Sequence, residues 1–137
     1  MLLKKIHTCL WQSVVPRKPL TNYARGVWAE RYAALYLFFK GFRILATRFK
    51  TPVGEIDLIA VRNNVMVFVE VKSRTSLDSA RAAIAERSQY RISRAAQYFL
   101  SKNHCPAAYK NYTLRFDVIA LSKWKLVHIP NAWMIAS

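Results

Sequence analysis

Cysteine, glycine and long apolar runs are scarce in this sequence of 137 residues, and each scarcity excludes something. Cys9 and Cys105 lie far apart in no Cys-x-x-Cys pattern, which argues against a disulfide framework and a zinc ribbon. Packing, a helix end or a turn explains each of the three glycines, Gly26, Gly41 and Gly54. No stretch approaches the roughly 18 apolar residues of a membrane span, so we expect a soluble, cytoplasmic protein with reduced thiols.

Acidic residues are also scarce, because the chain has 7 Asp and Glu against 22 Lys and Arg, a formal charge of +15. Such a charge indicates a polyanionic partner. Nucleic acid, above all DNA, is the first candidate, and an anionic membrane surface is the alternative. Most of the acids gather in the candidate site described below, so a basic chain has concentrated its negative charge: Glu30, Glu55, Asp57 and Glu70.

The most informative stretch is GEIDLIAVRNNVMVFVEVK, residues 54–72, which predicts a β-hairpin. Its two halves, 55–62 and 65–72, are rich in valine, isoleucine and leucine, as strands are. Asn63 and Asn64 between them suit the positive φ angles of a two-residue turn. A turn of this length fixes which residues of the two strands face each other.

Three carboxylates and one ammonium converge on one side of this hairpin. The turn sets Asp57 opposite Glu70 and Glu55 opposite Lys72, and alternate residues of a strand share a face. Directly opposed carboxylates repel each other unless a raised pKa or a bound cation relieves the repulsion. Mg²⁺ takes carboxylate oxygens and keeps positions for water and phosphate. Lys72 would then hold or activate the attacking water, or stabilise charge on the phosphate.

An ordinary salt bridge is the alternative interpretation of this pattern. In that case Glu55 pairs with Lys72 across the hairpin, and the other two acids lie on a solvated face. Against this alternative, the acid-bearing face also carries apolar side chains and is therefore half buried: Ile59, Met66 and Phe68.

The same residues resemble a known nuclease motif. Asp57, followed after twelve residues by Glu70-Val71-Lys72, resembles the PD-(D/E)xK nuclease superfamily. Within it, GEIDLIA followed by VFVEVKSR closely resembles the YraN family of predicted endonucleases. The resemblance extends to Glu30 in GVWAERYAALYL, to GFRIL at 41–45 and to RFDVI at 115–119, and covers about residues 21–120.

This resemblance implies an α/β fold, the restriction-endonuclease-like sandwich in which helices flank a central mixed β-sheet. It also implies a metal-dependent DNA endonuclease that hydrolyses phosphodiester bonds with Mg²⁺, or Mn²⁺ in its place. The implied metal ligands are Asp57, Glu70 and the carbonyl of Val71. The implied catalytic residues are Lys72, as the catalytic lysine, with Asp57 and Glu70, and in second place Glu55 and Glu30. The alternative is a non-catalytic nucleic-acid-binding protein that retains the nuclease fold.

Residues 1–20 are a basic extension that has two prolines and no acidic residue. One domain is expected to follow, at residues 21–137. We expect a first helix from Asn22 to Lys40, closed by Gly41. A strand at 42–49 precedes the hairpin, and Asp117 is interpreted as structural. The remaining expected elements are helices over 79–103, with a break near Ser88, and strands at 113–121 and 125–129.

Four arginines are expected to contact nucleic acid: Arg74, Arg87, Arg91 and Arg94. Arg74 follows the site strand, and the others lie on the outer face of the helical segment, where arginine also keeps a helix soluble. The sequence departs from the family here, because Ser88 stands where the family has a lysine. If that lysine contributes to activity, Arg87 or Arg91 has to replace it.

No base-reading element is recognisable, so we expect structured or single-stranded DNA as the substrate rather than one fixed sequence. A single active site nicks one strand, and cutting both strands would call for a homodimer. The sequence leaves the oligomeric state open.

Overall fold

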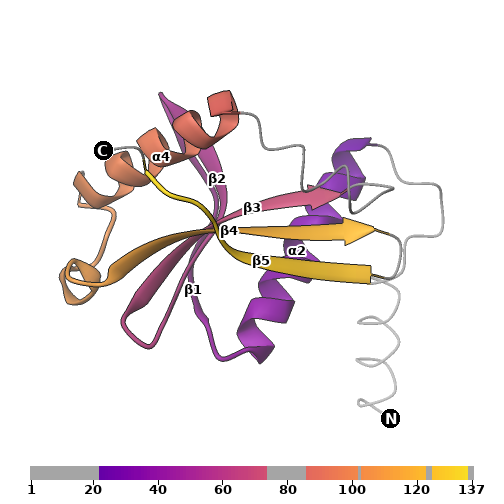
Figure 1. Ribbon diagram of the computed structural model, residues 1–137, viewed down its shortest axis with the longest axis horizontal. Coiled ribbons are helices and arrows are strands. Elements are labelled where there is room, and N and C mark those ends of the chain that lie inside the picture. Colours follow the sequence, from indigo (N-terminus) through magenta and orange to yellow (C-terminus); the bar gives the residue numbers. More distant parts are fainter. Residues whose placement is uncertain (1–21, 74–85, 102, 123–124, 136–137) are drawn as a thin grey trace, which may run out of the picture.

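A computed structural model describes residues 22–73, 86–101, 103–122 and 125–135 (Figure 1). The elements are α2 (Asn22–Phe39), β1 (Arg43–Thr51), β2 (Gly54–Arg62), β3 (Val65–Ser73), α4 (Glu86–Ser101), a 3₁₀ turn (Ala107–Tyr109), β4 (Thr113–Ser122) and β5 (Lys125–Trp133). The predicted extension at 1–20, Arg74 and the part of the predicted helices before Glu86 lie outside the described residues.

In the described part of the chain, one five-stranded sheet lies between α2 and α4, with strand order β1-β2-β3-β4-β5. Only the central pair, β3 and β4, is parallel, and the other neighbours are antiparallel. α2 packs on one face and α4 on the other, each over its own buried cluster (Figure 1). The predicted α/β architecture, with a mixed sheet between helices, is therefore confirmed. No helix in the described ranges combines the length and apolar composition needed to cross a bilayer.

The packed faces of both helices follow their apolar spacing. α4 buries one face against the sheet, with Ile92, Ala95, Ala96 and Phe99. α2 buries the narrow stripe that contains Ala33 and Leu37. α2 ends at Phe39, one residue before the predicted end, and Gly41 closes it as predicted: its φ is +87°, and the N–H of Phe42 donates to the carbonyl of Leu37 at 3.0 Å.

The hairpin also forms as predicted. Asn63 and Asn64 have φ angles of 50° and 61°, Arg62 faces Val65, and regular pairing continues to Leu58 and Val69. From Glu86 to Ser101 the helix is continuous and includes Ser88. The segment in which the predicted short helix would join it precedes Glu86 and lies outside the described residues, so the break near Ser88 stays a prediction.

Successive residues of a strand normally alternate between the two faces of a sheet, and this alternation fails in β2 beside the candidate acids. Ile56 and Ile59 both belong to the cluster under α4, whereas Leu58 belongs to the cluster under α2. Asp57 lies at this irregularity. On the neighbouring strand β1, Arg48 has a φ of 50° and lies between two residues that pair regularly with Leu58 and Ile56, the neighbours of Asp57. The sheet therefore departs from regular geometry at Asp57.

Gly54, the first residue of β2, permits a close approach of α4. A Cβ atom at this position would lie 2.6 Å from the backbone oxygen of Arg91. We expect Gly54→Ala to push α4 outward and to lower the free energy of unfolding by about 1–3 kcal/mol. Gly26→Ala is the matched control, because a Cβ there meets nothing within 4 Å. In a helix this change should stabilise by about 0.5–1 kcal/mol. Equal urea midpoints for the two variants would contradict the close approach.

Candidate active site

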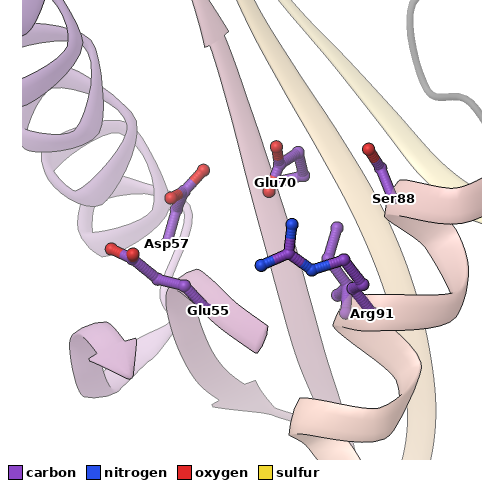
Figure 2. A pocket seen from close by; sticks show the side chains of 6 residues that line it. Glu55, Asp57, Glu70, Ser88 and Arg91 are labelled. Carbon is purple, nitrogen blue, oxygen red and sulfur yellow. The ribbon is translucent and has the colours of Figure 1, made fainter. Parts of the chain in front are cut away.

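A pocket of about 260 Å³ lies at the irregular end of the hairpin, between the sheet and α4 (Figure 2). β2 contributes Glu55 and Asp57, and β3 contributes Glu70. The facing wall is α4, with Ser88, Arg91 and Ile92. In Figure 2 the guanidinium of Arg91 points from α4 toward the carboxylates. The structure thus brings three predicted acids and one predicted phosphate-binding arginine to a single cavity.

Asp57 and Glu70 form the centre of this site. The N–H of Val71 donates to Asp57 Oδ2 at 2.7 Å, and the two carboxyl groups are close enough to share a proton. The expected ladder pair of Asp57 with Glu70 is not found, because regular pairing of β2 with β3 stops at Leu58 and Val69. The Asp57 side chain instead takes a backbone donor beyond that point. Burial, reinforced by the charge of Glu70, raises the pKa of Asp57 to about 8.

Lys72 lies beside the same pair. Its Nζ is 2.8 Å from Glu70 Oε1, and both side chains are largely shielded from solvent, with exposures of 21% and 15%. The alternative interpretation, in which Lys72 pairs with Glu55 across the hairpin, is therefore wrong. The ammonium group lies next to a carboxylate that lines the pocket, as a residue that acts on a bound phosphate or water would.

Glu30 lies on α2 outside the pocket lining, close enough for its charge to act on the carboxylates of the site, and it pairs with Arg48. Arg48 Nε lies 3.4 Å from Glu30 Oε2. Burial raises the pKa of Glu30 above its ordinary value; Arg48 opposes the rise, and the charges of Glu55 and Glu70 add to it. Sequence reasoning missed Arg48, because its place depends on its own positive φ, which no local pattern of a non-glycine residue indicates.

Carboxylate oxygens, such as those of Asp57 and Glu70, are the ligands that a hard divalent cation prefers. Within the described parts of the chain, no three His, Cys, Asp or Glu side chains come close enough together to hold a metal ion by themselves. Mg²⁺, however, is commonly held by one or two carboxylates and completes its shell with water and substrate oxygens. Burial and the charge of Glu70 raise the pKa of Asp57, and a bound cation would relieve the repulsion between these two adjoining carboxylates. The N–H and C=O of a strand residue point to the same neighbour, so the carbonyl of Val71 lies on the Asp57 side. The residues therefore fit Mg²⁺.

The other predicted nucleic-acid contacts differ in position. Arg91 lines the pocket together with Ser88, whereas Arg87 does not, so of the two arginines expected to replace a lysine only Arg91 faces the carboxylates. Arg87 and Arg94 are exposed on α4, outside the pocket lining.

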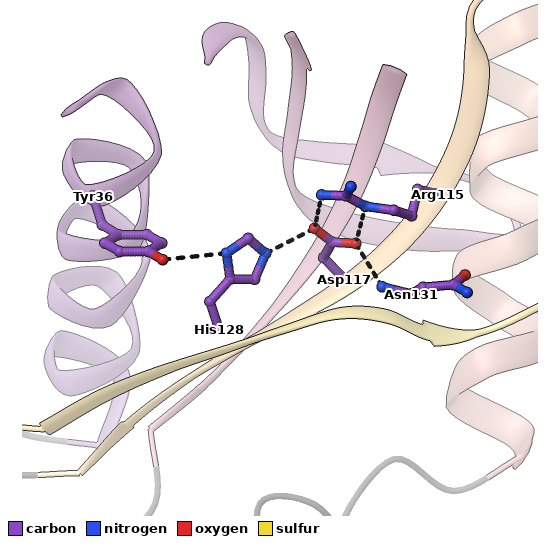
Figure 3. A network of polar contacts seen from close by, with 5 residues as sticks. All are labelled: Tyr36, Arg115, Asp117, His128 and Asn131. Atoms are coloured by element: carbon purple, nitrogen blue, oxygen red, sulfur yellow. Dashed lines mark hydrogen bonds and ion pairs between the residues drawn. The ribbon is translucent and has the colours of Figure 1, made fainter. Parts of the chain in front are cut away.

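Asp117 belongs to a separate buried network (Figure 3). Arg115 donates to both of its carboxylate oxygens at 2.8 Å, and the N–H of Asn131 donates to Oδ1 at 3.0 Å. His128 Nε2 lies 2.7 Å from Oδ2, while its Nδ1 lies 3.3 Å from the hydroxyl of Tyr36 on α2. Burial would raise the pKa of Asp117, but these hydrogen bonds outweigh it and hold the pKa below its ordinary value. This network supports the structural interpretation of Asp117.

Comparison with known proteins identifies relatives along most of the chain. Residues 29–121 match the family described as "Uncharacterised protein family UPF0102". A UPF0102 protein of Rhodopseudomonas palustris (strain HaA2) is 46% identical over 112 residues, which cover 81% of this chain and 85% of the relative. UPF0102 protein mlr4633 of Mesorhizobium japonicum is 47% identical over 112 residues, covering 81% and 87%. A UPF0102 protein of Bartonella tribocorum is 42% identical over 126 residues, covering 88% and 92%.

Proposed function

We propose a nuclease function for this chain, which belongs to the Uncharacterised protein family UPF0102. The proposed activity is metal-dependent hydrolysis of DNA phosphodiester bonds by a PD-(D/E)xK endonuclease of restriction-endonuclease-like fold, acting in the cytoplasm. One observation carries the proposal: Asp57 and Glu70 share a pocket with Arg91, and Lys72 is bonded to Glu70. The charge of +15 supports a polyanionic substrate.

Each residue has a definite task in this proposal. Asp57, Glu70 and the carbonyl of Val71 would hold Mg²⁺, or Mn²⁺ in its place. When bound, the cation offsets charge that develops on the phosphate and makes a water molecule a better nucleophile. Lys72 would orient that water or stabilise the phosphate charge, and Arg91 would bind a phosphate oxygen from the opposite wall. Glu55 and Glu30 would support the pair, Glu55 from the pocket lining and Glu30 through its charge.

A non-catalytic nucleic-acid-binding protein is the alternative. Two points favour it: Ser88 lines the pocket where the resemblance implies a lysine, and within the described ranges no third ligand-type side chain completes a metal cage. Both functions predict salt-dependent binding to DNA, since Lys and Arg neutralise phosphates in either case. Metal-dependent cleavage separates them.

The test is a Mg²⁺ and Mn²⁺ titration of the protein against linear, single-stranded, flap and junction DNA. We expect cleavage with metal, none with EDTA, and a loss of about 100- to 1,000-fold in Lys72→Ala, the usual effect of removing a charge-stabilising group. Lys125→Ala, an exposed lysine on β5, should cleave normally. Binding without cleavage under any metal would establish the alternative, and cleavage of both strands would call for a dimer.

A further inference from the structure

The outer face of α4 carries an exposed tyrosine among arginines. Arg87, Tyr90, Arg91 and Arg94 are spaced by three and four residues, so their side chains are neighbours on one helix surface. All four are exposed, and Tyr90 has 66% of its surface in solvent. We name this set the arginine-tyrosine ridge. The opposite face of α4 makes the core contacts, so packing does not account for the tyrosine.

The ridge begins inside the candidate site. Arg91 both belongs to the ridge and lines the pocket that contains Asp57 and Glu70. Tyr90 lies about 100° around the helix from Arg91, on the side away from Ser88 and Ile92, and its ring is exposed outside the pocket lining. A strand with one phosphate between Arg91 and the carboxylates would therefore reach this ring by continuing over the outer face of α4.

The chemistry of the ridge fits unpaired nucleotides. Arginines bind phosphates of any nucleic acid, whereas an exposed aromatic ring gains most from a base whose own face is free. Bases inside a duplex are already stacked on their neighbours and present only their edges to a protein. An aromatic ring between positive charges is the usual composition of a single-strand-binding surface.

We propose that Tyr90 stacks on an unpaired base of a strand that leaves the pocket over the outer face of α4, so that the preferred ligand is single-stranded DNA or the single-stranded part of a flap. Arg87 and Arg94 hold the flanking phosphates, and Arg91 directs the strand into the pocket. This inference rests on the proposed nuclease site for its location, but its ligand binding does not require cleavage.

The test measures binding in EDTA, where cleavage is absent. Fluorescence anisotropy with a labelled single strand and the matched duplex compares wild type with Tyr90→Ala, Tyr90→Phe and Tyr32→Ala. Tyr32 is an equally suitable control ring, since it is 53% exposed on α2 and outside the pocket lining. Tyr90→Ala should weaken single-strand binding by about 5- to 100-fold, the range found for loss of one base stack. Duplex binding should change less than about twofold, and Tyr90→Phe and Tyr32→Ala should match wild type.

The outcomes separate this inference from the nuclease proposal. Equal losses on single strand and duplex, or a Tyr90→Phe defect as large as that of Tyr90→Ala, would overturn the stacking role. Unchanged binding by Tyr90→Ala would overturn it as well. A Tyr90-dependent single-strand preference in a protein that never cleaves would support the stacking role while refuting the nuclease. Metal-dependent cleavage without such a preference would do the reverse.

Discussion

Asp57→Asn should abolish metal-dependent cleavage, with a loss of about 1,000-fold or more, and at the same time stabilise the metal-free protein. Asparagine retains an oxygen that accepts the N–H of Val71, which lies 2.7 Å from Asp57 Oδ2. It lacks the charge that binds a cation, so the ligand pair with Glu70 is lost. Cleavage assays in Mg²⁺ measure the first effect, and calorimetric titration with Mn²⁺ should detect no binding.

The stability effect depends on pH. The pKa of Asp57 is raised from 3.8 to about 8, first by burial and then by Glu70. A group with a raised folded-state pKa contributes stability that is complete below its unfolded pKa and is lost as pH rises toward the folded one. The metal-free wild type should therefore weaken relative to Asp57→Asn between about pH 4 and pH 8, reaching a difference of about 1–3 kcal/mol.

Urea unfolding in EDTA at pH 5 and pH 8 measures this difference. Glu86→Gln is the control, because it makes the same carboxylate-to-amide change at an exposed position of α4 outside the pocket lining. Full activity of Asp57→Asn would rule out Asp57 as a ligand. A variant that is less stable than wild type at pH 8 would show that the carboxylate serves the fold rather than the chemistry.

Asp117→Asn should have the opposite effect on stability, a loss of about 3–5 kcal/mol at neutral pH. Asp117 has no exposed surface, and its two oxygens serve Arg115, His128 and the N–H of Asn131. An ionised carboxylate only accepts hydrogen bonds, so His128 Nε2 carries a proton toward it. The amide of asparagine would place a donor against a donor and would leave the arginine without its counter-charge. Thermal or urea unfolding measures the loss.

The stability that Asp117 contributes depends on pH in the opposite direction to that of Asp57. The pKa of Asp117 is held below its ordinary value, because its hydrogen bonds outweigh the effect of burial. Its stabilisation is therefore present at and above about pH 4 and disappears as pH falls through the lowered pKa. Tyr36→Phe removes only the 3.3 Å contact at the far end of the network and should cost about 0.5–1 kcal/mol. Equal losses in the two variants would contradict the central role of Asp117.

Local patterns were sufficient to predict the part of the site that the hairpin builds. The Asn63-Asn64 turn fixed the register as far as Leu58 and Val69, which brings Asp57 close to Glu70 although the two do not form the predicted ladder pair. The same rule predicted the wrong partner for Lys72, because its flexible side chain pairs with Glu70 on its own strand and not with Glu55 on the facing strand. Backbone geometry was thus predictable where side-chain partners were not.

The remainder depends on tertiary contacts that leave no local signal. Arg48 needs a positive φ in a strand, and the Asp117 network joins β4 with β5 and, through His128, with Tyr36 on α2. Arg91 reaches the pocket because Gly54 lets the backbone of α4 approach β2 closely. The sequence alone left Arg87 and Arg91 as alternatives for this position, since helical spacing does not give the rotation of a helix relative to a sheet.

The parallel pairing of β3 with β4 sets an order for the assembly of the site. The β2–β3 hairpin closes through a turn of two residues, and such turns form within microseconds. The pairing of β3 with β4 must wait until the chain has crossed the sheet through α4, a far larger loop to close. Asp57, Glu70 and Lys72 lie on the hairpin, whereas Arg91 joins them only when α4 packs against β2. We therefore expect the carboxylates to meet first, so that the site is most negatively charged before α4 has packed on the sheet.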